Sequence, residues 1–141
     1  IIRNMSGLGI YTTWYDVDAV NTVVANCGQQ LLGITLGGNY NFTHCTLANY
    51  WSAGQRQDPA FVFNNYNTAQ APALNATFTN CILDGTLDEE FAFDLDTSGG
   101  KGKYQFNSCM LRTQKNTSNA NHYVSVFVNK DPVFADKSKN D

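Results

Sequence analysis

Apolar and polar positions alternate in short frames that recur along the chain. Four frames carry an apolar residue, any residue, a small polar residue or histidine, and then a cysteine: residues 24–27, 42–45, 78–81 and 106–109. Residues 2–5 fit the same frame, with Met5 in the cysteine position. We call this frame motif A. Alternation sends every second side chain to one face of a strand, so motif A predicts a short strand that ends at a bend.

A second frame, motif B, alternates with the first. It reads apolar, any residue, apolar, then Asn or Asp, at residues 61–64, 91–94 and 126–129, with weaker copies at 34–37 and 9–12. Strand-forming units that recur every 20 residues or a little more are typical of solenoids, in which one coil buries its apolar face only against the next. The repeat therefore predicts an all-β chain, a right-handed parallel β-helix of about five coils.

The spacing of motif A predicts where loops leave the coils. Successive frames are separated by 22, 18, 36 and 28 residues. The 36-residue interval indicates one coil with two excursions, at residues 52–58 and 67–73. A β-sandwich would also give short strands, but it does not explain why one tetrapeptide frame recurs.

The polar residue of motif A predicts an asparagine ladder. The chain has 17 asparagines, and asparagine tolerates the left-handed backbone conformation that a sharp bend requires. We expect Phe42 with His44, and Phe78 with Asn80, to point inward. Each polar side chain would then stack on its counterpart in the next coil, as amides do in ladders of identical strands.

The four cysteines favour a stack of buried thiols, one in each coil. Their even number also permits disulfides in an exported protein, although side chains stacked in register point the same way and fit poorly to disulfide geometry. No Cys-x-x-Cys spacing is present, and we expect no metal site at the cysteines.

Charge and length exclude several classes of protein. A net charge of −3 and a pI near 5.2 argue against a nucleic-acid partner, and no apolar run is long enough to predict a transmembrane helix. The chain starts in mid-pattern without an initiator methionine and ends without a capping element. We therefore expect residues 1–141 to be one β-helix segment, incomplete at both ends. Its open coils would pair with the remainder of the same polypeptide or with another chain.

Three stretches resemble a known group of proteins. Residues 42–47, 78–84 and 131–134 resemble right-handed parallel β-helix repeat proteins of the pectate-lyase-like superfamily. Residues 44–51 are similar to a subgroup that occurs as surface lipoproteins of Gram-negative bacteria. The resemblance implies the C-terminal part of a longer solenoid. It also implies an extracellular, outer-membrane-surface or periplasmic location.

Enzymes of that superfamily act on polysaccharides with clustered carboxylates, some of which hold Ca²⁺. Here the alternation in residues 91–96 turns Asp94 and Asp96 outward together. They are the leading catalytic candidates and the only place where we consider Ca²⁺; no other cofactor is expected. The aligned residues of neighbouring coils are Asn64 and Asn129, which are not carboxylates. We therefore favour a solvated strand face over a catalytic pair.

The candidate ligand-binding residues are aromatic or basic. Trp14 and Tyr15 form one pair and Tyr50 and Trp51 another, and exposed rings of this kind stack on sugars. Covering the corners of the core is the alternative role, and the one we favour. Arg112 follows an inward-facing leucine and is expected to face outward, without a partner that the sequence identifies.

These patterns lead to three hypotheses about function. The first is an exported, non-catalytic β-helix that binds a polysaccharide or glycan, or serves as a scaffold, at the cell surface. The second is a polysaccharide lyase or glycoside hydrolase. The third is a structural subunit of a surface assembly. We favour the first, which is not an enzyme, because no convergent set of acid and base residues is evident.

Overall fold

The computed structural model describes residues 1–66 and 71–137, and its strands form three sheets, here named A, B and C. Sheet A has the order β1 (Ile2–Arg3), β4 (Val23–Ala25), β7 (Thr46–Asn49), β10 (Ile82–Gly85), β13 (Met110–Leu111), β15 (Phe127–Val128). Sheet B contains β2 (Ile10–Thr13), β5 (Leu32–Thr35), β8 (Phe61–Asn64) and β11 (Phe91–Asp94). Sheet C contains β3 (Val17–Val20), β6 (Gly38–Thr43), β9 (Leu74–Thr79), β12 (Gly102–Asn107) and β14 (Tyr123–Val124). A 3₁₀ turn, η1, spans Ser98–Gly100.

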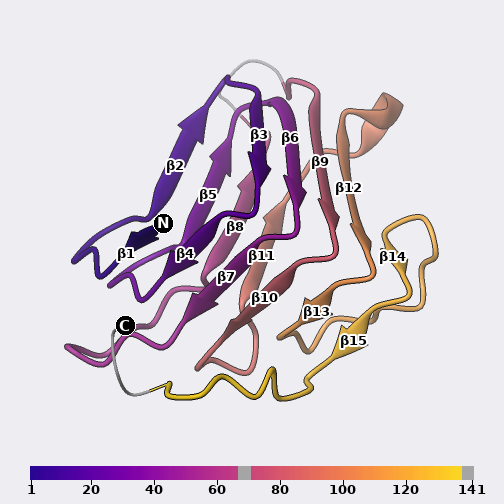
Figure 1. Cartoon of the computed structure of the whole chain (residues 1–141). Coiled ribbons are helices and arrows are strands. Elements are labelled where there is room, and N and C mark those ends of the chain that lie inside the picture. Colours follow the sequence, from indigo (N-terminus) through magenta and orange to yellow (C-terminus); the bar gives the residue numbers. More distant parts are fainter. Residues whose placement is uncertain (67–70, 138–141) are drawn as a thin grey trace.

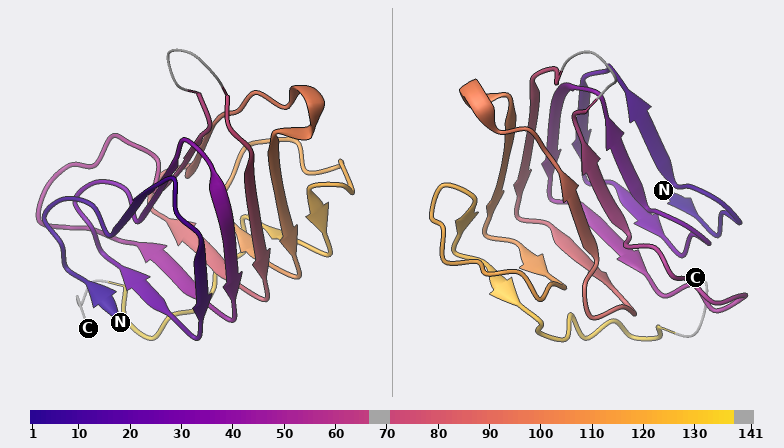
Figure 2. Two further views of the ribbon diagram at one scale, coloured as in Figure 1. Left: turned by 90° about the horizontal axis from the view of Figure 1, so that it is seen from above. Right: turned by 180° about the vertical axis from the view of Figure 1, so that it is seen from behind.

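Consecutive strands visit sheets A, B and C in turn, and we call one such passage a circuit. Neighbours within each sheet come from successive circuits and are parallel (Figures 1 and 2). The fifth circuit lacks its sheet B strand, because residues 112–122 are irregular. The chain is thus all-β with parallel sheets, which is compatible with the predicted β-helix.

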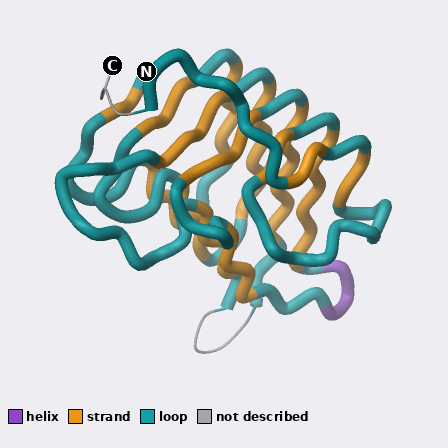
Figure 3. The backbone as a smooth tube through the Cα atoms, turned by 90° about the horizontal axis from the view of Figure 1, so that it is seen from below, coloured by secondary structure: helices purple, strands orange, loops and turns teal. Residues whose placement is uncertain are grey.

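The register confirms the frames that carry phenylalanine. Phe42 pairs with Phe78, and Phe78 with Phe106, in sheet C. Phe61 pairs with Phe91 in sheet B, and Asn64 is opposite Asp94. The long interval also has its first loop where it was predicted, between β7 and β8; the segments between strands run around the stack in Figure 3. The second loop lies between β8 and β9, and residues 67–70 of the predicted excursion lie outside the described residues.

Several weaker frames were misaligned. Val24 pairs with Leu47 in sheet A, so residues 24–27 and 2–5 lie at a different corner from residues 42–45. The position of Phe42 is taken by Ala19 in the first circuit. Residues 126–129 belong to sheet A through β15, and the sheet B partner of Phe61 is Leu32, two residues before the predicted frame at 34–37. Likewise Ile10, not Gly9, is opposite Leu32.

The bends have the predicted backbone but the opposite side-chain direction. His44, Asn80 and Ser108 all have φ between 52° and 55°. However, His44 and Asn80 are exposed, so the prediction that they point inward was wrong. The residue after each left-handed bend, a cysteine, takes the buried position instead. Bonded amides occur elsewhere, on the outer face of sheet C, where Asn75 Nδ2 donates to Asn39 Oδ1 at 3.0 Å.

The core consists of rows of like side chains stacked from circuit to circuit. Phe42 and Phe78 stack with ring centroids 4.9 Å apart, and Phe78 and Phe106 at 5.1 Å. Cys27, Cys45, Cys81 and Cys109 are buried free thiols. Burial raises the pKa of the Cys45 thiol. Cys45, Cys81 and Cys109 follow the bend before sheet A and form a row, as the sequence predicted. Cys27 lies at the corner after sheet A, so the prediction that it joins the same stack was wrong.

Asparagine side chains join the circuits by a different contact from the predicted ladder. The Asn49 side chain accepts from Cys27 N–H at 3.1 Å and donates to Cys27 O at 2.9 Å. Asn129 does the same to Thr113, and Asn65 to Asp96. Each amide therefore satisfies both backbone groups of one residue where the regular strand has ended.

Candidate functional site

The outer face of sheet A brings together the side chains of Asp84, Arg112 and Tyr50 near the carboxyl ends of its strands. Asp84 in β10 pairs with Ala48 of β7, and Arg112 directly follows β13. Leu83 and Leu111 are aligned and buried, so the next residue on each strand faces outward. As a result Arg112 Nε lies 2.8 Å from Asp84 Oδ1, and this is the partner of Arg112 that the sequence did not identify.

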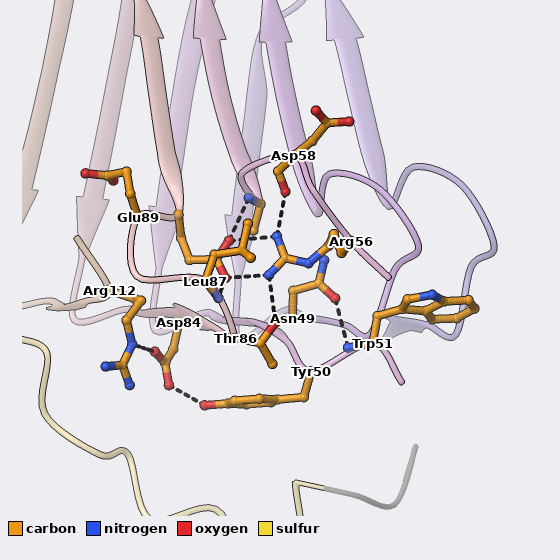
Figure 4. A network of polar contacts seen from close by, with 12 residues as sticks. Asn49, Tyr50, Trp51, Arg56, Asp58, Asp84, Thr86, Leu87, Glu89 and Arg112 are labelled. Atoms are coloured by element: carbon orange, nitrogen blue, oxygen red, sulfur yellow. Dashed lines mark hydrogen bonds and ion pairs between the residues drawn. The ribbon is translucent and has the colours of Figure 1, made fainter. Parts of the chain in front are cut away.

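Tyr50 completes this group from the loop after β7. Its hydroxyl donates a hydrogen bond to Asp84 Oδ2, so the carboxylate lies between the phenol and the guanidinium (Figure 4). Burial and this hydrogen bond raise the pKa of Tyr50, and the bond to Asp84 raises the pKa of Arg112. The arrangement fixes the Tyr50 ring in one orientation, because its hydroxyl is held by a carboxylate that is itself buried.

The C-terminal segment, residues 130–137, returns along sheet A toward the first circuits (Figure 1). We call it the strap. The ring of Phe134 meets the Tyr50 ring edge-on, with centroids 6.0 Å apart. Lys137 Nζ lies 5.3 Å from the centre of the same ring and forms an ion pair of 2.5 Å with Asp131. Tyr50 therefore contacts the strap through two of its side chains.

Between the strap and sheet A lies a pocket of about 260 Å³. Its floor is made of short side chains of β4 and β7, and Tyr50 and Phe134 contribute aromatic rings. The polar lining comes from amide, hydroxyl and charged groups. The lining residues are Val23, Ala25, Asn26, Thr46, Ala48, Tyr50, Phe134, Ala135, Asp136 and Lys137.

A second buried carboxylate, Glu90, lies near this site but is fully enclosed. Arg56 Nη1 and Nη2 contact its two oxygens at 2.8 and 2.5 Å, and both side chains are almost completely buried. The backbone N–H groups of Ala60 and Leu87 also donate to Glu90, each at 2.9 Å. The pair fastens the loop between β7 and β8 to the next circuit.

The predicted acidic pair is engaged in local contacts. Asp94 is exposed and accepts a hydrogen bond from Asn64 Nδ2 at 2.9 Å. Asp96 accepts from Ser98 N–H at 2.9 Å and lies 3.8 Å from Lys101. Hydrogen bonds from the side chain and then the backbone of Ser98 lower the pKa of Asp96. In residues 1–66 and 71–137, no three His, Cys, Asp or Glu side chains are grouped as metal ligands.

The predicted aromatic residues do not form one surface. Trp14 and Tyr15 are 56% and 71% exposed between β2 and β3, at the corner of sheets B and C. Tyr50 and Trp51 follow sheet A, and Trp51 points away from Asp84 (Figure 4). Of these four, only Tyr50 lines the pocket beneath the strap.

The sequence interpretation missed Arg56, Asp84, Glu90 and Phe134 as residues of this region. One signal was available for Asp84. The alignment of Cys81 and Leu83 with Cys109 and Leu111 also places Asp84 beside Arg112 at the next position.

No protein-family model, curated protein or solved structure matches the chain. The likeness to pectate-lyase-like proteins therefore stays a prediction from the sequence. Within the described ranges, none of the helical structure is both apolar and long enough to cross a membrane.

Proposed function

We propose that this chain is a segment of a right-handed parallel β-helix that binds a glycan, without cleaving it, in the pocket between sheet A and the strap. The binding residues are Tyr50 and Phe134, with Asn26, Thr46, Asp136 and Lys137 as the polar lining. Asp84 and Arg112 are positioning residues, because they hold the Tyr50 hydroxyl.

The observation that carries this proposal is the fixed aromatic ring at a small pocket with mixed lining. Sugars present apolar C–H faces and polar edges, so they bind where flat aromatic area adjoins hydrogen-bonding groups. Tyr50 offers such a ring, held by Asp84, and Phe134 offers a second one. Ala25 and Ala48 leave room between the rings and the sheet.

The contacts of the carboxylates favour binding over hydrolysis or elimination. A glycosidase needs two carboxyl groups free to face a sugar, one as an acid and one as a base or nucleophile. Here Asp84 is bonded to Tyr50 and Arg112, and Glu90 to Arg56 and two backbone N–H groups. Asp94 and Asp96 are bonded to Asn64 and Ser98. A surface location is part of the proposal and rests on the likeness of residues 44–51 to surface lipoproteins.

A glycan array with matched variants tests the proposal. The chain should retain at least one glycan, and Phe134→Ala should weaken that binding about tenfold, a change of 1.4 kcal/mol. Phe127→Ala is the control, because Phe127 is 59% exposed on sheet A and does not line the pocket. Products are assayed with and without Ca²⁺. An array without a positive signal, equal losses in both variants, or release of cleaved product would each overturn the proposal.

A further inference from the structure

The course of the strap restricts what can extend from the pocket. Asp131 lies close enough to Arg112 and Tyr50 to act on the pKa of both. Phe134 then contacts Tyr50, and residues 134–137 line the pocket. Residues 130–133 therefore lie along the face of sheet A between β15 and the pocket (Figure 1). An extended ligand that continued from the pocket toward Arg112 would have to occupy the same space.

The pocket is also small. Its volume of about 260 Å³ is below the roughly 300–1,000 Å³ that encloses drug-sized ligands. This is room for one sugar ring with its hydroxyl groups, and a second ring in the direction of Arg112 would meet the strap. An interior unit of a polysaccharide needs a free path on both sides, whereas a terminal unit needs only one.

We propose that the pocket takes the terminal sugar of a glycan chain and that the strap is the element that excludes interior units. This inference rests on the proposed glycan binding and adds the class of ligand. The specificity comes from the chain itself, because the strap occupies the path that the continuing saccharide would follow.

The strap is attached in a way that allows it to be removed without loss of the sheets. Asn129 N–H donates to Leu111 O just before the strap begins. Within the strap, the side chains of Phe134 and Lys137 contact Tyr50. Val133 in the middle of the strap is 81% exposed. Segments with so few buried contacts open at low cost.

Counting bound molecules against chain length tests the inference. The probe is the polysaccharide that binds most strongly on the array, used intact and after partial acid hydrolysis at equal mass. A protein that binds ends should find binding sites in proportion to chain ends, so tenfold shorter chains should offer about tenfold more sites per gram. Val133→Ala should behave identically, because this side chain points into solvent.

Deleting residues 130–141 should change that relation. The truncated protein also lacks Phe134, Asp136 and Lys137, so it should bind more weakly. The binding that Tyr50 retains should follow mass, with equal site numbers on intact and hydrolysed polymer, after the fold has been checked by circular dichroism. Site numbers that follow mass in the full chain overturn the inference and leave glycan binding intact. Absence of binding to either sample overturns the proposed function, and this inference falls with it. The result for the full chain decides the matter even if the truncated protein does not fold.

Discussion

Two buried carboxylates of the fourth circuit, Glu90 and Asp84, have opposite surroundings. Glu90 receives four donors, two from Arg56 and two from the backbone, and neither partner of the ion pair reaches solvent. Asp84 receives donors from Tyr50 and Arg112, and the Arg112 side chain is 26% exposed. The first carboxylate closes a loop, whereas the second holds two side chains at a surface that a ligand can reach. Burial of a charge therefore does not by itself indicate function; the exposure of its partners separates the two cases.

Breaking the enclosed pair should have the largest effect. Arg56→Met leaves Glu90 buried without a counter-charge, so unfolding should become easier by about 3–5 kcal/mol. Denaturant unfolding monitored by circular dichroism measures this change. Converting Glu90 to Leu in the same protein should recover only part of the loss, because Ala60 and Leu87 then keep unpaired N–H groups. Full recovery in the double variant would contradict the structural role that we assign to those backbone bonds.

Removing the negative charge of Asp84 should destabilise the fold less than removing Arg56, but should weaken glycan binding more. Asp84→Asn removes the ion pair with Arg112 and weakens the acceptor for Tyr50, and we expect a loss of about 1–2 kcal/mol. Glycan binding should fall more than it does in Arg56→Met, compared at a temperature where both variants are folded. If Asp84→Asn bound normally, Asp84 would not position Tyr50.

The pH dependence of Tyr50 should sharpen the contrast further. Its pKa is raised above the ordinary value of 10.0 by burial and by Asp84. A raised folded pKa means that the stabilising contribution is complete below pH 10. It is lost as the pH rises from there through the folded pKa, because between the two pKa values only the unfolded chain releases the proton. Tyr50→Phe should cost about 0.5–1 kcal/mol at neutral pH and flatten the decline above pH 10. The pKa of Tyr123 is also raised, and Tyr123 contributes equally to the loss of stability at high pH in both proteins. Parallel declines in the two proteins would show that Tyr50 is not shielded.

Loosening the strap should have the smallest effect. The hydrogen bond with Lys137 lowers the pKa of Asp131, with smaller contributions from Val133 N–H and Arg112. A depressed pKa gives a contact that is present at neutral pH and is lost as the pH falls through it. Asp131→Asn should leave the unfolding midpoint unchanged but speed hydrogen exchange in residues 130–137 at neutral pH. The difference from wild type should vanish in acid. A persistent difference there would assign the effect to another contact.

The sequence predicted the parts of the fold in which a large apolar residue marks each circuit. Phe42, Phe78 and Phe106 aligned correctly because each alternates with polar neighbours and precedes a left-handed bend. Residues 24–27 misled the alignment because the corner after sheet A also uses a left-handed asparagine, Asn26, followed by a buried residue. Because the same tetrapeptide frame occurs at two corners of the fold, the frame alone does not show which strands pair.

The site was only partly within reach of the sequence. Tyr50 and Arg112 were identified as candidate ligand contacts, and the alignment of Leu83 with Leu111 implied that Asp84 lies beside Arg112. Arg56 and Phe134 were not predictable in this way. Both belong to irregular segments whose path is set by contacts between circuits and not by the repeat.

The unequal length of the circuits has a consequence for how the chain folds. Cys27 and Asn49, in neighbouring circuits, are 22 residues apart, whereas Cys45 and Cys81 are 36 apart although they occupy adjacent places in one row. Relative to the shorter segment, the longer one adds less than the ~0.6 kcal/mol of chain-entropy cost that a doubling of length would add. That extra cost must be met before any contact forms in the fourth circuit. Folding that spreads from neighbour to neighbour should therefore slow at the step that joins Leu47 to Leu83. The ion pair between Arg56 and Glu90 forms after that step, so it should slow unfolding more than it speeds folding.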